Sequence, residues 1–283
     1  MSVHAPPALF SGVLVWVYGF CSCASTPERA GITRAERVLE QRGVSCELWP
    51  GILAAAGAVE AVYWGRLEQV VDALQRADVA PVEWRGILGT SGAVEAVFKN
   101  KLGEVVQRLL EGGVGSAFWI PILRSKTMSA AIEQNSFPGV ISGMEPVPLH
   151  LWVDVLGSRG ALKAVLRCNF ERVLSTLACV DPELWAGILN STGFTEVVVH
   201  DELEQLSTLG CVPHHLWAAI LNASGACTAI EWKNFSELTG VLLKNSIAVE
   251  HWPEVLNMST PAVYEAVFNE DMALARDAGP IRA

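Results

Sequence analysis

The stretch Pro182-Glu183-Leu184-Trp185-Ala186-Gly187-Ile188-Leu189-Asn190-Ser191-Thr192-Gly193 recurs in altered form along the whole chain. It joins a proline, which suits a first helical turn, to apolar residues at helical spacing. Each related stretch, here called a copy, is centred on one aromatic residue: Phe10, Trp49, Trp84, Trp119, Trp152, Trp185, Trp217 and Trp252. Successive tryptophans of this series lie 35, 35, 33, 33, 32 and 35 residues apart. Such a period is typical of helical repeat arrays.

Each copy has three parts. A glycine eight residues after the tryptophan, such as Gly92 or Gly193, lies where a left-handed glycine would end the first helix. A second apolar part follows, and a third begins at a large apolar residue such as Leu102 or Phe137. Pro138, directly after Phe137, favours separate second and third helices in that copy, and the other copies leave two or three helices open.

No strand pattern competes with these helices. We therefore expect an all-α chain, an α-solenoid of about seven to eight helical repeats of 32–39 residues. Residues 8–275 would form a single array, with residues 1–7 and 276–283 as tails.

Composition restricts the partners. The 283 residues are 51% hydrophobic, with a formal net charge of −10 and a pI near 5.1. This acidity argues against a nucleic-acid partner, which requires clustered Lys and Arg. The seven cysteines have no disulfide-like spacing. Cys179 and Cys211 precede equivalent valines and are predicted to be small buried residues, which favours a reducing, cytoplasmic location.

The uncharged residues 8–24 allow two interpretations. Residues 8–14 match residues 47–53 position by position, with Phe10 in the tryptophan position, which indicates a divergent first copy. Their apolar character and small residues also fit a targeting segment, although no basic residue precedes them. We expect membrane contact only under the second interpretation.

The second and third parts resemble ankyrin repeats. The run from Ala96 to Val106 is similar to that family's Ala-Ala, Asn-Gly-His and Leu-Glu-Val-Val sequence. Leu109-Leu110-Glu111-Gly112-Gly113 is similar to its Leu-Leu-Glu-x-Gly ending. Ser91-Gly92-Ala93-Val94 replaces the family's Thr-Pro-Leu-His, and the tryptophan helix replaces its hairpin. This resemblance implies a helical array that binds proteins.

The first and second parts also resemble TAL-effector DNA-binding repeats. Trp84 to Leu88, Thr90-Ser91 and Gly92-Ala93 are similar to that family's short helix, two-residue loop and glycine pair. The resemblance implies base-reading positions in each copy, among them Thr90-Ser91, Ser158-Arg159 and Ser191-Thr192. Glu60, Glu95 and Glu196 stand where the family places residues that face phosphates, and carboxylates would repel them.

Aromatic residues suggest both core and surface roles. The tryptophan series predicts one buried indole per copy, since large aromatic residues commonly fill helical cores. An exposed peptide-binding stripe is the alternative. Trp64 and Trp232 lie outside the series at equivalent positions and are predicted to be exposed contact residues.

The position two residues before the tryptophan is occupied by His150, Glu183, His215 and Glu250 in four copies. In a stacked array these side chains would form a pH-sensitive ladder. An ordinary solvated helix start is the alternative. A ladder spreads ligands along an axis, so we predict no metal site here.

The segments that follow the tryptophan helices vary most between copies. Polar loops along one edge of a repeat array are usual contact surfaces. The candidate partner-binding residues there are Arg124, Lys126, Ser158, Arg159 and Ser191.

We find no catalytic motif, and predict no catalytic residue, cofactor or metal. The sequence therefore favours a non-enzymatic scaffold that binds a protein partner through its concave face and loop edge. A nucleic-acid reader of TAL-effector type is the alternative.

Overall fold

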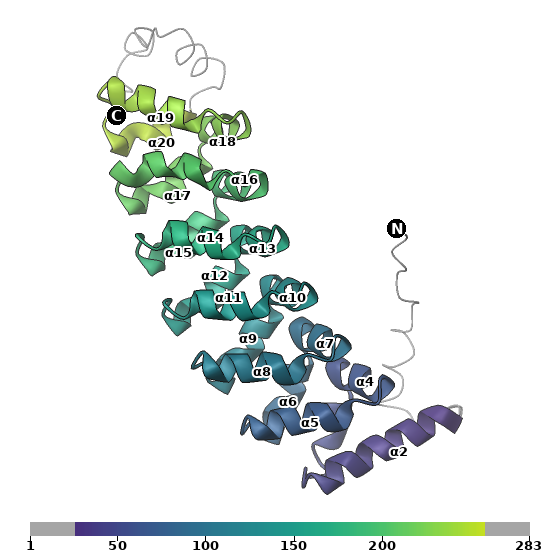
Figure 1. The fold of residues 1–283 in the computed structure, drawn as a ribbon. Helices are drawn as coiled ribbons and strands as arrows, with labels where there is room; N and C mark the ends of the chain where they lie inside the picture. Colours follow the sequence, from purple (N-terminus) through teal and green to yellow (C-terminus); the bar gives the residue numbers. More distant parts are fainter. Residues whose placement is uncertain (1–25, 258–283) are drawn as a thin grey trace. The chain divides into compact units, whose positions relative to one another are not determined.

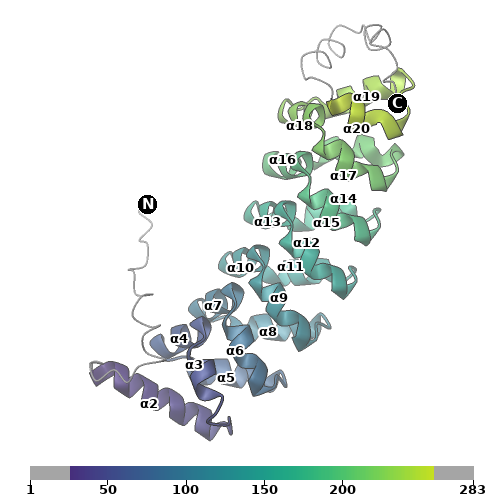
Figure 2. The same ribbon diagram turned by 180° about the vertical axis from the view of Figure 1, so that it is seen from behind.

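The computed structural model describes residues 26–257, and every regular element within this range is a helix (Figures 1 and 2). The all-α prediction is therefore confirmed for these residues. The predicted copy around Phe10, the proposed targeting segment 8–24 and both tails lie outside the described range. Within it, no helix combines the length and the apolar character needed to cross a bilayer.

The chain divides into two compact units after Ile141, called here the N-terminal and C-terminal units. The prediction of a single array from residue 8 to 275 concerns continuity across this division and stays a prediction. In the N-terminal unit α2 (Thr26–Gln41) comes first and packs against α4 and α5. Three copies follow, with these helices: α3 (Trp49–Leu53), α4 (Ala56–Tyr63), α5 (Leu67–Arg76), α6 (Pro81–Leu88), α7 (Ser91–Phe98), α8 (Leu102–Glu111), η1 (Ser116–Phe118), α9 (Trp119–Arg124), α10 (Lys126–Glu133) and α11 (Phe137–Met144), which contains the division.

The C-terminal unit repeats the same order. Its helices are η2 (Leu149–Leu151), α12 (Trp152–Gly157), α13 (Arg159–Leu166), α14 (Phe170–Leu177), α15 (Pro182–Asn190), α16 (Thr192–His200), η3 (Leu203–Cys211), α17 (His214–Asn222), α18 (Ser224–Glu231), α19 (Phe235–Lys244), η4 (Val249–His251) and α20 (Trp252–Asn257). The second and third parts are separate helices in each complete copy described, as Pro138 indicated for its own copy.

Equivalent helices of consecutive copies pack against one another within each unit (Figure 1). In the N-terminal unit α4, α7 and α10 form one row, and α3, α6 and α9 form another. In the C-terminal unit the rows are α13, α16 and α18, then α12, α15, α17 and α20, then α14, η3 and α19. Within each unit, consecutive copies thus bury apolar faces against one another.

The glycine eight residues after the tryptophan does not end a helix, contrary to the sequence prediction. Gly92 is the second residue of α7, is buried, and has no positive φ. A Cβ at Gly92 would lie 2.6 Å from the carbonyl oxygen of Leu123 in the next copy, and one at Gly193 would lie 2.6 Å from that of Leu221. These glycines are therefore required by close packing between copies.

The left-handed residue comes sixteen positions after the tryptophan instead, after the second helix. Asn100 has φ 59°, its N–H bonds the Val97 carbonyl, and the Lys101 N–H bonds the Ala96 carbonyl at 2.6 Å. These two bonds are those of a Schellman helix ending. The equivalent residues, all with positive φ, are Gly65, Asn135, Cys168, Asp201 and Lys233.

Candidate functional site

The tryptophan series belongs to the core. Trp84, Trp119 and Trp252 are fully buried, and Trp152, Trp185 and Trp217 are at most 4% exposed. Each indole N–H donates a hydrogen bond to the carbonyl five residues earlier, for example from Trp119 to Val114 at 2.9 Å. The bond closes the turn that leads into each tryptophan helix. Trp49 is half-buried, and the other six described members of the series have both a buried ring and an occupied donor, so these six offer no indole to a ligand.

Ser158 and Ser191, two of the predicted partner-binding residues, are buried helix caps. The Ser191 hydroxyl accepts a bond from Phe194 N at 3.4 Å and donates one to the Ile188 carbonyl at 2.6 Å. Ser158 makes the equivalent bonds to Ala161 N and the Val155 carbonyl. A single residue joins the two helices, so the predicted polar loop does not form. The prediction that these serines contact a partner directly is corrected to a capping role.

The remaining residues of the predicted loop edge are exposed. Arg124 ends α9, Lys126 begins α10, and Arg159 begins α13. Arg159 belongs to the C-terminal unit and the other two to the N-terminal unit. Their combination into one basic patch stays a prediction.

Asparagines at the ends of tryptophan helices link consecutive copies of the C-terminal unit. Asn190 Oδ1 accepts a hydrogen bond from Arg159 N at 3.1 Å, and Asn222 Oδ1 accepts one from Thr192 N at 3.0 Å. Asn257 does the same for Ser224 N at 3.1 Å. Each asparagine thus caps the second helix of the preceding copy, a role that sequence reasoning missed.

Of the pairs in the predicted ladder, only that of His150 with Glu183 is present in the structure. His150 Nε2 lies 3.3 Å from Glu183 Oε1, and both side chains are more than 60% exposed. His215 and Glu250 are exposed and make no polar contact with the described residues. Exposed pairs contribute about 0–1 kcal/mol, so the solvated helix start fits these residues best.

An aromatic strip lies at the ends of α4 and α7 in the N-terminal unit. It comprises Tyr63, 72% exposed, Trp64, 46% exposed, and Phe98, 47% exposed. The Trp64 ring meets those of Tyr63 and Phe98 edge to face, with centroids 5.1 and 6.1 Å apart. Trp64 is thus exposed, as predicted. Sequence reasoning did not identify Tyr63 and Phe98 as exposed. The signal was present, because the equivalent position is a glutamate in the Trp119 and Trp217 copies, and a glutamate suits an exposed position.

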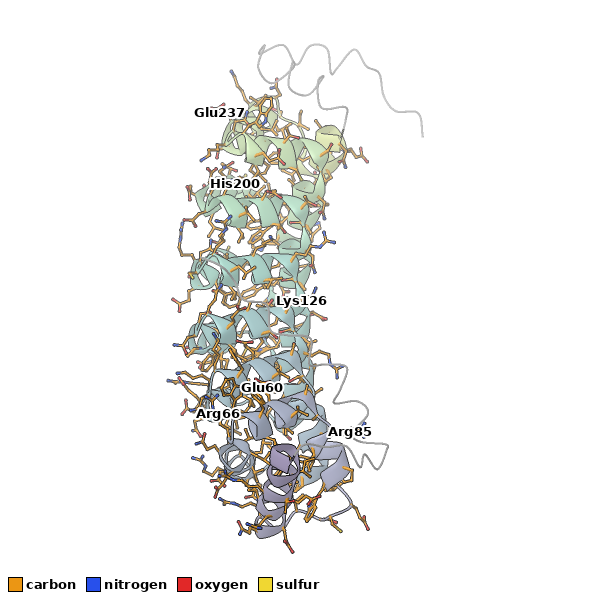
Figure 3. The ribbon with its side chains drawn as sticks, turned by 90° about the vertical axis from the view of Figure 1, so that its right-hand side faces the viewer. Glu60, Arg66, Arg85, Lys126, His200 and Glu237 are labelled. Carbon is orange, nitrogen blue, oxygen red and sulfur yellow. The ribbon has the colours of Figure 1, made fainter. Side chains whose placement is uncertain are left out.

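Polar neighbours fix the aromatic strip in place. The Trp64 indole N–H donates to Glu60 at 2.6 Å. The Arg66 guanidinium lies 5.5 Å from the Trp64 ring centroid and donates to the carbonyls of Val97 and Phe98. Glu60 and Arg66 are labelled in Figure 3. Arg66 therefore ties the end of α7 to the preceding copy and covers one ring by a cation–π contact.

Trp232 is the counterpart of Trp64 in the C-terminal unit. It follows α18 and is 63% exposed, as predicted. Lys233 follows in a left-handed conformation and forms an ion pair with Glu202, whose side chain is 10% exposed. The hydrogen bond with Glu202 raises the pKa of Lys233.

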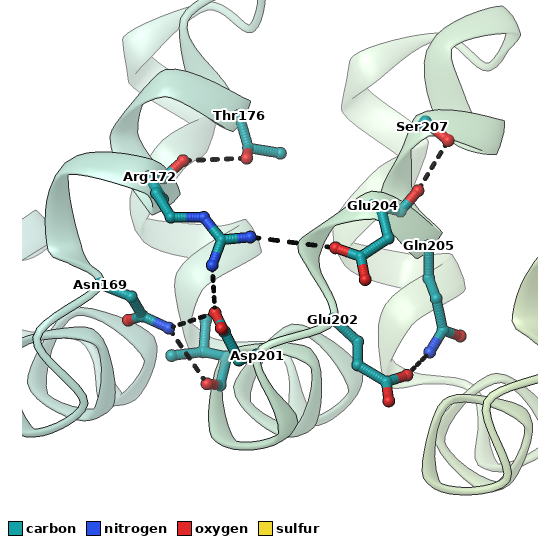
Figure 4. A network of polar contacts seen from close by, with 9 residues as sticks. Asn169, Arg172, Thr176, Asp201, Glu202, Glu204, Gln205 and Ser207 are labelled. Carbon is teal, nitrogen blue, oxygen red and sulfur yellow. Dashed lines mark hydrogen bonds and ion pairs between the residues drawn. The ribbon is translucent and has the colours of Figure 1, made fainter.

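A groove of about 710 Å³ lies between α14 and η3 in the C-terminal unit, and its wall carries a polar network (Figure 4). Arg172 Nη1 bonds Asp201 Oδ1 at 2.7 Å, and Arg172 Nη2 lies 3.9 Å from Glu204 Oε2. Asn169 Nδ2 also donates to Asp201, at 3.2 Å. The bonds from Asn169 and then Arg172 lower the pKa of Asp201. The network joins α14, α16 and η3.

Cysteines and possible metal ligands are the remaining reactive groups among the described residues. None of the five described cysteines forms a disulfide, and Cys179 and Cys211 are exposed, so the prediction that these two are buried is wrong. Burial raises the pKa of the Cys227 thiol, and Glu196 and Glu231 raise it further. Residues 26–257 contain no group of three or more His, Cys, Asp or Glu residues placed to hold a metal ion.

Comparison with known proteins yields no match to a family model, to a curated protein or to a solved structure. The ankyrin and TAL-effector resemblances therefore stay expectations from the sequence.

Proposed function

We propose that this chain is a non-enzymatic α-solenoid scaffold of the reducing cytoplasm that binds a protein partner. The aromatic strip of Tyr63, Trp64 and Phe98 is the observation that carries this proposal. Aromatic side chains exposed side by side are characteristic of contact surfaces, because they bury much area at a small entropic cost. Most other large apolar residues of the described copies are in the core.

The polar residues that recur between copies support the same proposal, because they stabilise the scaffold itself. Tryptophan N–H groups close turns, the hydroxyls of Thr90, Ser125, Ser158 and Ser191 cap helices, and asparagines link copies. A framework so constrained would present surface residues at fixed spacing, which suits a binding protein.

The alternative, a nucleic-acid reader of TAL-effector type, has less support. By that resemblance Thr90, Ser158 and Ser191 would be base-reading residues, yet all three are buried with their hydroxyls engaged. Retention on an oligonucleotide column at low salt, followed by elution over a narrow rise in salt concentration, would favour this alternative.

Affinity capture with mass spectrometry tests the scaffold proposal. Wild-type chain would be compared with a Trp64→Ala, Phe98→Ala variant and with an Arg124→Ser, Lys126→Ser, Arg159→Ser variant. We expect the first variant to lose the principal partner, since exposed aromatic anchors contribute much of the affinity. Loss with the second variant would support the loop edge. A partner retained by both variants would contradict these surfaces, and recovery of nucleic acid alone would contradict the scaffold proposal.

A further inference from the structure

The aromatic strip of the N-terminal unit continues into a small recess between α5 and α8. The recess has a volume of about 260 Å³, and its lining includes Arg66, Gln69, Arg76 and Asn100. Arg66 belongs to both surfaces, because its guanidinium lies 5.5 Å from the Trp64 ring centroid and also lines the recess. The strip and the recess therefore form one surface.

The apolar part of this surface is open to solvent. Tyr63, Trp64 and Phe98 are each at least 46% exposed. Adjacent rings meet edge to face with their centroids 5.1 and 6.1 Å apart, so the three side chains present one apolar area. Exposed aromatic residues gathered in this way are characteristic of a surface that binds another molecule.

Two arginines give the recess a positive charge that no carboxylate balances. Arg66 donates through Nη1 to two backbone carbonyls, and Arg76 donates through Nε to one. Neither guanidinium forms an ion pair within residues 26–257. Glu104, which also lines the recess, is paired with Lys101 at 2.8 Å. The recess therefore favours an acidic ligand, because a carboxylate can accept two parallel bonds from a guanidinium.

The charges beside the strip point the same way. Glu60 already accepts a hydrogen bond from the Trp64 indole at 2.6 Å, and Glu95 lies 3.9 Å from Lys99. Lys99 Nζ in turn lies 5.7 Å from the Phe98 ring centroid, so cations flank the strip at both of these rings. Residues 1–141 contain 13 acidic and 12 basic residues, so the sequence of this unit is almost neutral. An acidic ligand is therefore not repelled by the unit as a whole.

The rings and the side-chain donors indicate which backbone form fits here. In a polyproline II segment, prolines three residues apart lie on one face about 9 Å apart, which lets each contact a different ring of the strip. The carbonyls of such a segment make no internal hydrogen bonds, and the exposed amides of Gln69 and Asn100 can donate to them. An added strand would need a sheet edge, and the described range contains helices alone.

We propose that this surface binds a proline-rich, acidic segment of a protein partner, whose prolines pack on the aromatic strip and whose Asp or Glu residues pair with Arg66 and Arg76. Surfaces lined by aromatic residues are the usual receptors for polyproline II segments. The inference rests on the proposed scaffold function and specifies the chemistry of the partner segment.

Fluorescence anisotropy with the full chain tests the inference. The probe is a short fluorescein-labelled peptide in which two prolines three residues apart are followed by three aspartates. One control peptide has lysine in place of aspartate, and the other has alanine in place of proline. We expect saturable one-to-one binding of the proline–aspartate peptide that weakens as salt rises. Both control peptides should bind about tenfold more weakly or not at all.

Arg76→Glu tests the recess. It should weaken binding of the proline–aspartate peptide by about tenfold or more, because a carboxylate replaces a cation that faces the ligand. Arg85→Glu is the matched control. Both arginines are exposed and lie in the last turns of their helices, α5 and α6, but Arg85 does not line the recess. Figure 3 shows Arg85 away from Arg66. Arg85→Glu should bind like the wild type.

Trp64→Ala tests the strip. It should also weaken binding by about tenfold or more, because the central ring of the apolar area is lost. Trp232→Ala is its control, since Trp232 is exposed at the equivalent position of a C-terminal copy, where Glu231 replaces the tyrosine. This variant should keep the wild-type affinity. Circular dichroism of all four variants verifies that they are folded.

Absent binding of the proline–aspartate peptide, equal binding of either control peptide, or undiminished binding by Arg76→Glu or Trp64→Ala would overturn the inference. Capture of a protein partner that depends on Trp64 and Phe98 would persist in these cases if the scaffold proposal alone is correct. A chain that neither binds the peptide nor captures a protein through these residues would contradict both proposals.

Discussion

The indole N–H of Trp119 donates a 2.9 Å hydrogen bond to the carbonyl of Val114, and neither residue is more than 1% exposed. The bond joins the entry turn of the copy to its first helix. Equivalent bonds recur in all seven described copies, from Trp49 to Trp252. The tryptophan is therefore required for its polar edge as well as for its volume.

Trp119→Phe separates these two contributions. The smaller ring leaves a void, and the Val114 carbonyl stays buried without its donor, so we expect the free energy of unfolding to fall by about 2–4 kcal/mol. Urea unfolding followed by circular dichroism gives this value. Trp64→Phe is the control, because Trp64 is 46% exposed and its loss should change stability by less than about 1 kcal/mol. Equal effects of the two substitutions would contradict the role of the Val114 bond.

Gly92→Ala tests the close approach between copies. Its Cβ would lie 2.6 Å from the Leu123 carbonyl oxygen, so α7 and α9 would have to separate, at a cost of about 1–3 kcal/mol. Gly103→Ala, whose Cβ would lie 3.7 Å from Ala73 Cβ, should instead stabilise α8 by about 0.5 kcal/mol. Thermal melts of both variants compare their stability with that of the wild type. The prediction fails if Gly92→Ala melts at or above the wild-type temperature.

Cys168→Gly should stabilise the chain. Cys168 has φ 57°, a conformation that costs a residue with a Cβ about 1 kcal/mol and costs glycine little. Since glycine also gains freedom in the unfolded chain, we expect a net gain of about 0.5 kcal/mol. Arg167→Gly, one residue earlier at φ −96°, should destabilise instead. Chemical denaturation of the two variants measures the change in the free energy of unfolding for each. A loss of stability in Cys168→Gly would contradict the prediction.

The raised pKa of Glu95 predicts that the stability of the fold depends on pH. Burial raises its pKa above the ordinary value of 4.5, and Glu133 and Glu60 raise it further, while Lys99 opposes them. Because the folded pKa exceeds the unfolded one, the ionised carboxylate destabilises the fold above the folded pKa, and this penalty vanishes as pH falls below the unfolded value. Glu95→Gln should therefore unfold at higher urea than the wild type at pH 7, with the difference smaller at pH 4.

Glu83→Gln serves as the comparison in the same experiment, since Glu83 lies in the first turn of α6, where its negative charge favours the helix dipole. We expect it to lower stability slightly at pH 7. A gain from Glu83→Gln equal to that from Glu95→Gln would show that net charge, rather than the surroundings of Glu95, is responsible.

Much of the local structure is predictable because it depends on residues close in sequence. The period placed the tryptophan helices, Pro182 occupies the first turn of α15, and the Asp181 side chain caps that helix. η3 is a 3₁₀ helix, and its buried Leu203, Leu206 and Leu209 lie three positions apart. This spacing was also present in the sequence, and it was overlooked because it differs from the α-helical period by less than one residue.

By itself, the sequence determined the helical class of the described residues and the burial of six tryptophans from Trp84 to Trp252, because periodic apolar residues, prolines and caps act within a few positions. Only the tertiary structure decided what the glycines and asparagines that recur between copies do. Gly92 is needed because of a carbonyl in the next copy, and Asn222 caps a helix 30 positions earlier. The aromatic strip and the groove between α14 and η3 depend in the same way on which copies lie side by side, since exposure is a property of packed neighbours and not of residue type.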